Sequence, residues 1–309
     1  MRRKVAAVIA CILTAGLLYA GYQVWQQGSE YLRASNAYSQ LDAYVQTQST
    51  FRPTAEASQS AAALQGEVRE SASPVCTAVP AADIPTAAPQ SVGAGEPIQT
   101  LEPPAAVEKE YDYPDVVWPE VDFEQLKQIN PEIVGWIYDE GMGLNYPVVQ
   151  AQDNVKYLTT LFDGRRNKTG CLFLDAGNAA DFSDRHSIIY GHNRKNGSMF
   201  GRLSRYKKQR YYEEHPRILL ITEQGRYVLE IFSGHVARSN SGAWKIRFAD
   251  ETEFAQWRSI ICERSSIKTG VRPEEGERIL TLSTCSYEFE NARYVVHGVL
   301  RKAKFPKEE

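Results

Sequence analysis

The chain has 309 residues, of which 43% are hydrophobic and 24% are charged, and its formal net charge is -3 at pH 7. This length and composition suffice for one globular domain with its own core, with residues left for further segments. The Lys and Arg residues are scattered rather than grouped, so we expect no nucleic-acid partner. The five cysteines and five histidines show no paired metal-ligand spacing, which predicts no metal and no cofactor.

The N-terminal segment has the features of a membrane anchor. Three basic residues precede an apolar run at residues 5–22, and about 18 such residues cross the hydrocarbon core as a helix. A cleaved signal peptide is the alternative, but bulky Leu18 lies two positions before Ala20, where a cleavage site requires a small residue. We therefore predict an uncleaved single-pass anchor at residues 1–25 in the cell membrane, with its basic flank cytoplasmic and all later residues extracellular.

Two further segments follow the anchor. Apolar and aromatic residues at near-helical spacing, among them Tyr31, Tyr38 and Leu41, predict a juxtamembrane helix at residues 26–48. Residues 49–108 are rich in Ala, Pro, Ser, Gln and Glu, and their few large apolar side chains cannot offset the conformational entropy of folding. This stretch is expected to be a low-complexity, flexible stalk.

The remaining region, residues 109–309, is predicted to be mainly β with a few helices. One helix is expected at residues 121–128, because Pro131 discourages helix in the residue before it. A second is expected at residues 250–264, which carry acidic side chains in the first turn. Eight segments rich in β-branched and aromatic residues predict strands, a number typical of a closed barrel or sandwich. They are residues 133–138, 146–149, 171–174, 187–190, 218–222, 227–236, 279–283 and 294–302.

Three polar side chains of this region have the chemistry of acyl transfer. Cys285 ends an apolar strand, Arg293 follows eight positions later, and His192 lies upstream in the segment 190–193. A cysteine attacks a carbonyl as its thiolate and needs a base or a cation beside it. The oxyanion that results needs a donor that keeps its charge. A thiol, an imidazole and a guanidinium can fill these roles.

Each of these side chains also has a structural interpretation. A cysteine at a strand end is more often a core residue, but Cys285 is followed by polar residues that favour an accessible thiol. Arg293 could be a surface charge, whereas His192 lies in a loop-like context that leaves its ring accessible. An extracellular location would permit a disulfide between Cys171 and Cys262, although their apolar contexts favour buried free thiols. The other histidines are interpreted as structural or surface residues: His186, His215, His235 and His297.

The segments around these side chains together resemble the sortases, the transpeptidase family of Gram-positive cell surfaces. The resemblance covers residues 121–304, and the helix expected at residues 250–264 is a mark of class B. It implies an eight-stranded sortase-type β-barrel, preceded by a transmembrane helix and the stalk. Further segments follow in the order of the class B branch: residues 129–137, 144–150, 170–175, 198–200 and 293–298.

The resemblance implies a cysteine transpeptidase. Cys285 would attack the Thr carbonyl of a C-terminal sorting signal, Arg293 would stabilise the oxyanion, and His192 would protonate the leaving amine. The acyl group would then pass to an amine of a peptidoglycan precursor or stem peptide. The resemblance also implies a substrate groove lined by Asn145, Val149, Ser239, Trp244 and Ser283.

Two other classes of protein stay open at this point. Residues 204–207 fit S-x-x-K, while residues 168–170 and 268–270 fit K-T-G, as in a penicillin-binding-protein-like serine acyltransferase. Against that class, no S-D-N element lies between these motifs, and one K-T-G precedes the S-x-x-K. The other class is a catalytically silent wall-binding module with the same barrel. It would be favoured if the thiol, the imidazole or the guanidinium were missing, and all three are present.

Overall fold

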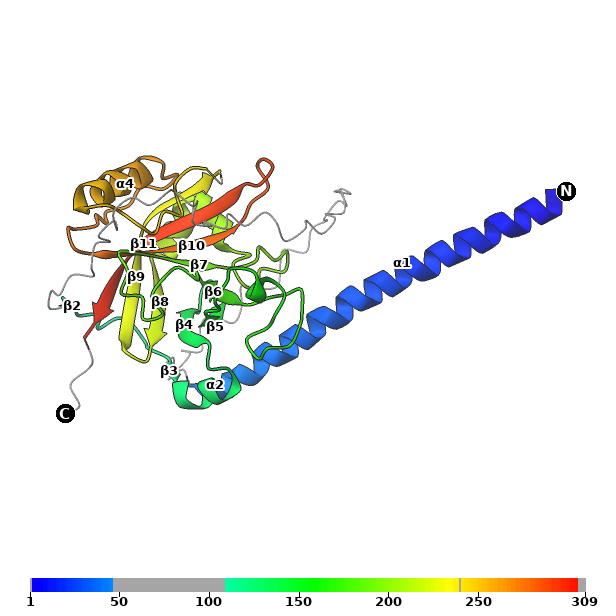
Figure 1. Ribbon diagram of the computed structural model, residues 1–309, viewed down its shortest axis with the longest axis horizontal. Coiled ribbons are helices and arrows are strands. Elements are labelled where there is room, and N and C mark those ends of the chain that lie inside the picture. The colour runs from blue at the N-terminus through cyan, green and yellow to red at the C-terminus, as the bar shows by residue number, and fades with distance from the viewer. Residues whose placement is uncertain (1, 47–108, 239, 305–309) are drawn as a thin grey trace, which may run out of the picture.

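A computed structural model describes residues 2–46, 109–238 and 240–304, and the predicted stalk falls outside these ranges. The body is a β-barrel from which one long helix projects (Figure 1). That helix, α1 (Arg2–Ser39), leads into a 3-10 helix (Gln40–Tyr44) and a short strand, β1 (Val45–Gln46). Strand β1 pairs antiparallel with β3 (Glu120–Val121). The predicted helix 26–48 therefore ends early, because its last residues join a strand pair.

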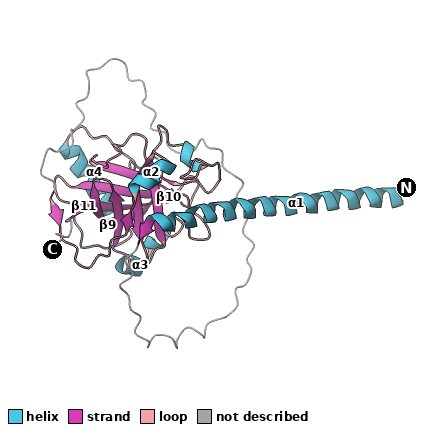
Figure 2. Cartoon of the chain, turned by 90° about the horizontal axis from the view of Figure 1, so that it is seen from below, coloured by secondary structure: helices cyan, strands magenta, loops and turns pink. Residues whose placement is uncertain are grey.

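Eight strands of one sheet close into the barrel, which confirms the fold expected from the sequence. Their order is β10-β7-β6-β5-β4-β8-β9-β11, and a pairing between β11 and β10 closes the ring. Strand β2 (Glu110–Tyr111) adds to the far end of β11. Figure 2 shows the strands gathered in the body, with α1 leaving it as a single helix. The barrel strands are β4 (Ile133–Asp139), β5 (Leu144–Val149), β6 (Leu172–Leu174), β7 (His186–Tyr190), β8 (Arg217–Thr222), β9 (Gly225–Ala237), β10 (Arg278–Cys285) and β11 (Arg293–Ala303).

Three shorter α-helices accompany the barrel: α2 (Phe123–Ile129), α3 (Gln209–Glu214) and α4 (Glu251–Glu263). Both predicted helices form, and each begins after an aspartate whose carboxylate accepts a hydrogen bond from a backbone N–H of the first turn. Helix α2 starts two residues later than predicted, since residue 121 pairs with β1. Helix α4 lies over the outer face of the barrel beside β9 and β11 (Figure 1), and it buries Phe254, Trp257 and Ile261.

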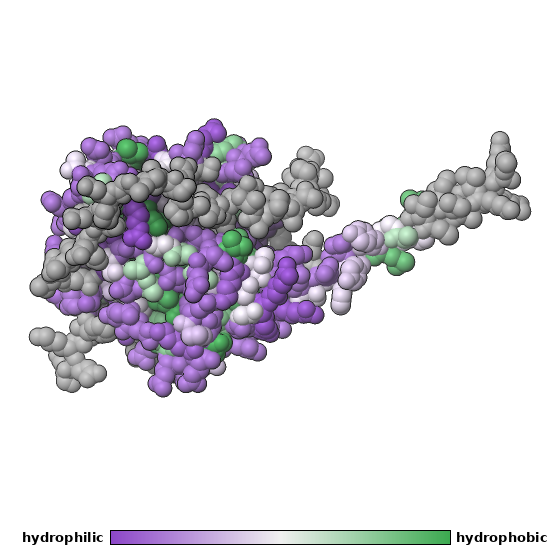
Figure 3. Space-filling view, viewed as in Figure 1, coloured by the Kyte–Doolittle hydropathy of each residue, from purple (hydrophilic) through white to green (hydrophobic). Residues whose placement is uncertain are grey.

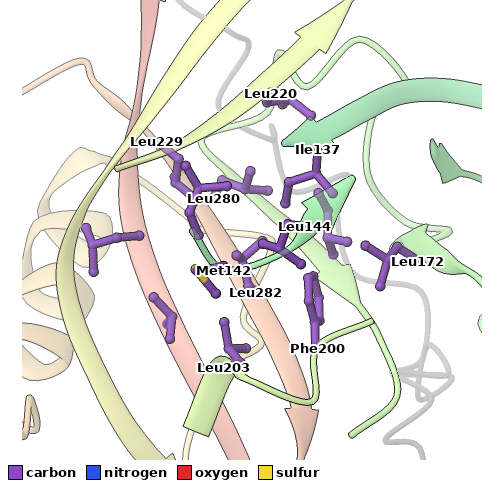
Figure 4. Close-up of a cluster of buried hydrophobic side chains, with 14 of the residues drawn as sticks. Ile137, Met142, Leu144, Leu172, Phe200, Leu203, Leu220, Leu229, Leu280 and Leu282 are labelled. Carbon is purple, nitrogen blue, oxygen red and sulfur yellow. The ribbon is translucent and has the colours of Figure 1, made fainter. Parts of the chain in front are cut away.

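The core is divided by the barrel wall. Alternate residues of a strand point to opposite faces, so Ile137 of β4 lies in the interior cluster while neighbouring Trp136 lies in a second cluster outside. Figure 4 shows the interior cluster, in which Leu280 and Leu282 of β10 meet Leu144 and other aliphatic side chains. The strand that ends at Cys285 is thus fixed by its own buried leucines.

The second cluster also receives the end of α1. Ala34, Ala37 and Leu41 are buried there, so the end of the helix belongs to the folded body. The earlier part of α1 projects from the barrel. Within residues 2–46, 109–238 and 240–304, no helix has the combined length and apolarity that a membrane crossing needs, and the anchor at residues 1–25 stays a prediction. Figure 3 shows apolar side chains on the projecting part, which exposes Leu13, Leu17, Leu18, Tyr19, Tyr22, Val24 and Trp25.

Candidate active site

A pocket at one end of the barrel gathers the three predicted side chains. His192, Cys285 and Arg293 all line it, around a cavity volume of about 60 Å³. Cys285 is the last residue of β10, Arg293 is the first residue of β11, and the antiparallel register pairs the two directly. His192 follows β7, which pairs with β10 along its opposite edge. Strand order therefore places the imidazole and the guanidinium on either side of the thiol.

Three hydrogen bonds join the end of β10 to the segment that carries His192. The N–H of Gly191 donates to the carbonyl of Ser283 at 3.1 Å, and the hydroxyl of Thr284 donates to the carbonyl of Gly191 at 2.7 Å. On the other side of His192, the amide of Asn193 donates to the carbonyl of Cys285 at 2.8 Å. Because these bonds flank both residues, they fix the backbone of His192 relative to that of Cys285.

The ring of His192 is oriented by a backbone carbonyl. Its Nε2 lies 2.8 Å from the carbonyl oxygen of Leu158. A carbonyl can only accept, so Nε2 carries the hydrogen and, in the neutral ring, Nδ1 holds the lone pair. Desolvation lowers the pKa of His192 below its ordinary value; the Leu158 carbonyl opposes this shift and the charge of Arg194 adds to it. Nδ1 of a neutral ring is therefore the nitrogen that can take up a proton.

A glycine allows Leu158 to lie close to the imidazole. Gly170 has a φ of +63°, and a Cβ there would lie 2.6 Å from the carbonyl oxygen of Tyr157 and 3.0 Å from Cδ2 of His192. The left-handed backbone and the close approach both require glycine. Neither Leu158 nor Gly170 was predicted from the sequence as a site residue, because both act through backbone atoms and no motif surrounds Leu158.

Comparison with known proteins identifies the fold and the pocket. The model of the Sortase domain family matches residues 137–301, which is more than half of the chain. The chain belongs to the sortase family. Sortase B of Staphylococcus aureus is 34% identical over 176 residues, 56% of this chain and 72% of that protein. Sortase B of Listeria monocytogenes is 30% identical over 181 residues, 58% of this chain and 74% of that protein.

The solved structures place this sortase in class B. The S. aureus sortase B–substrate complex is 33% identical and superposes with a TM-score of 0.56, covering 59% of this chain and 85% of that one. This sortase is therefore a class B cysteine transpeptidase, and neither of the two alternative classes is favoured. Ser204 of the S-x-x-K segment lies in a 3-10 helix (Leu203–Lys207), outside the lining of the pocket.

The five predicted groove residues divide into three groups. Trp244 and Ser283 both line the pocket, where the indole Nε1 of Trp244 donates to the hydroxyl of Ser283 at 3.0 Å. Asn145 and Val149 of β5 lie outside this lining: Asn145 accepts a hydrogen bond from Trp136, and Val149 is fully buried in the second cluster. Ser239 falls outside the described residues. The rest of the lining is mostly apolar or backbone: Leu158, Phe173, Tyr190, Gly191 and Thr284.

The remaining cysteines and histidines of the described residues lie elsewhere. Cys171 and Cys262 are free thiols, and burial raises the pKa of Cys171 to about 12, so it is a poor nucleophile. His186, His235 and His297 are buried beneath α4 rather than in the pocket. Among the described residues, no group of three or more His, Cys, Asp or Glu side chains could hold a metal ion.

Proposed function

We propose that this sortase cleaves a C-terminal sorting signal after Thr and transfers the acyl part to an amine of a peptidoglycan precursor or stem peptide. The observation that carries the proposal is the pocket in which Cys285, His192 and Arg293 meet. Two solved relatives support a peptide donor and an amine acceptor, since S. aureus sortase B is known in complexes with a substrate and with triglycine.

The first step forms a thioester. The thiol proton of Cys285 passes to Nδ1 of His192, and Sγ bonds to the Thr carbonyl carbon while the C=O electron pair moves onto oxygen. The guanidinium of Arg293 stabilises this oxyanion, because it keeps its charge and offers a planar set of donors. The carbonyl then re-forms, the C–N bond breaks, and the leaving amine takes the proton from His192.

The second step uses the same groups in reverse. An acceptor amine gives a proton to His192 and attacks the thioester carbon, and Arg293 again stabilises the oxyanion. A new C–N bond forms as the C–S bond breaks, and the Cys285 thiolate recovers its proton from His192. Because a neutral imidazole is required before each attack, its desolvated position suits the base role.

The location proposed for this chemistry is the outer face of the cell membrane, with residues 1–25 as a single-pass anchor and the N-terminus cytoplasmic. The exposed apolar side chains on the projecting part of α1 support this proposal. The full chain is expected to stay with the membrane fraction after an alkaline wash, whereas a chain without residues 1–25 is expected in the supernatant. Recovery of the full chain in the supernatant would contradict the anchor.

The nucleophile is tested with a matched pair of cysteine variants. Fluorescence-quenched pentapeptides with Thr fixed and the other positions varied serve as donors, and the thioester is detected by mass spectrometry. Cys285→Ala should abolish the thioester and lower cleavage at least a thousandfold, as loss of a covalent catalyst does (roughly 10³ or more). The control, Cys262→Ala on α4, should cleave like the wild type. Cleavage by Cys285→Ala within a hundredfold of wild type would contradict the assignment.

The same proteins distinguish the serine alternative. A methanethiosulfonate reagent should label the wild type at Cys285, and the Cys285→Ala variant should lose that label. A β-lactam should label neither protein at Ser204. Covalent modification of Ser204 would revive the serine acyltransferase, and labelling without any cleavage or transfer would favour the silent wall-binding module.

A further inference from the structure

A second pocket lies beside the active-site pocket, on the side of the barrel formed by β9 and β11. Its cavity volume is about 410 Å³. The connection after β9 serves both pockets, since Arg238 and Ser241 line the second pocket and Trp244 lines the first. The turn between Cys285 and Arg293 also reaches it, through Phe289. We call it the arginine pocket; its lining includes His235, Arg238, Asn240, Ser241, Arg264 and Phe289.

The arginine pocket is positively charged. Two guanidinium groups line it, and no acidic side chain is among the described residues of its lining. Arg238 lies over the ring of Phe289, 4.3 Å from its centroid, and Arg264 donates a hydrogen bond to the carbonyl of Ser241 at 2.6 Å. Each guanidinium carries five N–H donors, which is more than these contacts use. Both groups are thus held at the pocket with donors to spare for a ligand.

A buried imidazole adds a donor at the bottom of the pocket. His235 is 4% exposed, and its ring is stacked on that of His297 with 5.3 Å between centroids. Within the described part of the chain, neither ring nitrogen of His235 nor the hydroxyl of Ser241 has a hydrogen-bond partner. A buried polar group without a partner costs roughly 1–3 kcal/mol. The N–H of His235 and the two guanidinium groups therefore all suit one kind of ligand group, an anionic acceptor.

The strand register places this pocket within reach of the reacting thioester. His235 precedes Ala237 by two residues, and Ala237 pairs with Arg293. At about 3.3 Å per residue, this separation is about 7 Å along β9. The predicted groove residues Asn145 and Val149 belong to β5, which the sheet order places beyond β7 and β6 on the other side of β10. A sorting signal over β5 would leave the side of β9 and β11 open to the second substrate.

We propose that the arginine pocket binds a carboxylate or phosphate group of the amine acceptor and so directs its amine to the thioester on Cys285. This inference rests on the proposed function, because it assigns a place to the second substrate of that reaction. Arg238 and Arg264 supply charge-assisted hydrogen bonds to the anion, and His235 donates from below. An acceptor with an amine and an anionic group on one short chain is then preferred over a neutral amine.

Matched acceptors test this preference. The carboxylate pair is Nα-acetyl-lysine and Nα-acetyl-lysine amide, and the phosphate pair is O-phosphoethanolamine and ethanolamine. For the wild-type full chain, we expect kcat/KM for transfer to the anionic member of at least one pair to exceed that of the neutral member about tenfold or more, as hydrogen bonds to charged groups provide. Arg238→Gln and Arg264→Gln should each reduce the ratio to below about threefold. The control, Arg210→Gln, removes an exposed arginine paired with Glu214 on α3 and should keep the ratio.

The outcomes separate this inference from the function on which it rests. A preference in the carboxylate pair alone assigns a carboxylate, and one in the phosphate pair alone assigns a phosphate. A thioester that forms and transfers equally to all four acceptors would overturn the inference alone and leave a solvent-filled hollow. A preference that survives both arginine substitutions would overturn it as well. If no thioester forms on the wild type, the proposed function fails and this inference fails with it.

Discussion

The hydroxyl of Tyr38, near the end of α1, donates a hydrogen bond at 2.9 Å to the carbonyl of Gly170, 132 residues further along the chain. Gly170 in turn packs against the carbonyl of Leu158, which orients the ring of His192. A second bond joins the same two segments, since the amide of Asn167 donates to the carbonyl of Glu30 at 2.9 Å. The end of the projecting helix thus supports the loop that holds the imidazole.

This support predicts that the end of α1 cannot be removed without cost. A chain that lacks residues 1–107 should have an unfolding free energy several kcal/mol below that of a chain lacking only residues 1–25. Burial of one large apolar side chain contributes about 1.5–3 kcal/mol, and Tyr38 and Leu41 both pack on the second cluster. Urea unfolding at equal slopes measures the difference. Equal midpoints for the two chains would show that residues 26–46 are not part of the folded unit.

Gly170 gives a sharper prediction. Gly170→Ala would place a methyl group 2.6 Å from the carbonyl oxygen of Tyr157 and 3.0 Å from His192, so the loop must shift and kcat/KM for peptide cleavage should fall tenfold or more. The control is Gly164→Ala, whose φ of +83° is strained in the same way but whose Cβ would meet nothing within 4 Å. That variant should lose stability, by about 1–2 kcal/mol, and retain activity. Equal loss of activity in both variants would make general destabilisation the cause.

Beneath α4, three buried histidines form a hydrogen-bonded and stacked cluster. Nδ1 of His186 lies 2.7 Å from the carbonyl of Lys245 and must donate to it, so Nε2 accepts from the hydroxyl of Thr281 at 2.6 Å. The same hydroxyl oxygen then accepts from Nδ1 of His297 at 2.7 Å. His235 stacks on His297. Every ring in this arrangement is neutral.

The cluster predicts that stability falls in mild acid. Burial lowers the pKa of His186 to about 4 and, together with the charge of Arg264, that of His235 to about 4; the pKa of His297 is also lowered. In the unfolded chain these rings bind protons near pH 6.5, so the unfolded state binds more protons as the pH falls. The unfolding free energy should therefore decrease from about pH 6.5 down to about pH 4, with each ring contributing a loss of about 1.4 kcal/mol for every pH unit in that window.

Urea unfolding between pH 7.5 and pH 4.5 measures this slope. His235→Phe keeps a ring against His297 but cannot bind a proton, so its unfolding free energy should depend less steeply on pH than that of the wild type. A wild-type unfolding free energy that stays constant across this range would contradict the buried, neutral cluster.

The strands and the three reactive side chains could be predicted from the sequence because each is a local pattern. β10 alternates Leu280 and Leu282 toward the interior cluster and ends where polar residues begin, so both the strand and the exposed position of Cys285 follow from it. The pairing of Cys285 with Arg293 follows from the turn between two adjacent strands.

Other features depend on contacts between distant segments, and no local pattern announces them. The end of α1 at Ser39 is set by the pairing of β1 with β3, which brings Val45 against Val121 although the two are far apart in the sequence. Leu158 orients His192 through a carbonyl, which every residue possesses. The arginine pocket joins the end of β9, the end of α4 and a hairpin turn, and its charge appears only when these three segments meet.

Arg293 provides the last prediction, in a comparison of lysine with alanine. The register places Arg293 directly beside Cys285, so either substitution removes a guanidinium next to the thiol. If only positive charge mattered, Arg293→Lys would retain most activity. If the planar, forked donors hold the oxyanion, lysine should be nearly as poor as alanine, and both should lose roughly a hundredfold to a thousandfold in kcat. Labelling of Cys285 by a methanethiosulfonate controls for the fold, since the thiol is present in both variants. A lysine variant within about fivefold of wild type would reduce Arg293 to a general electrostatic role.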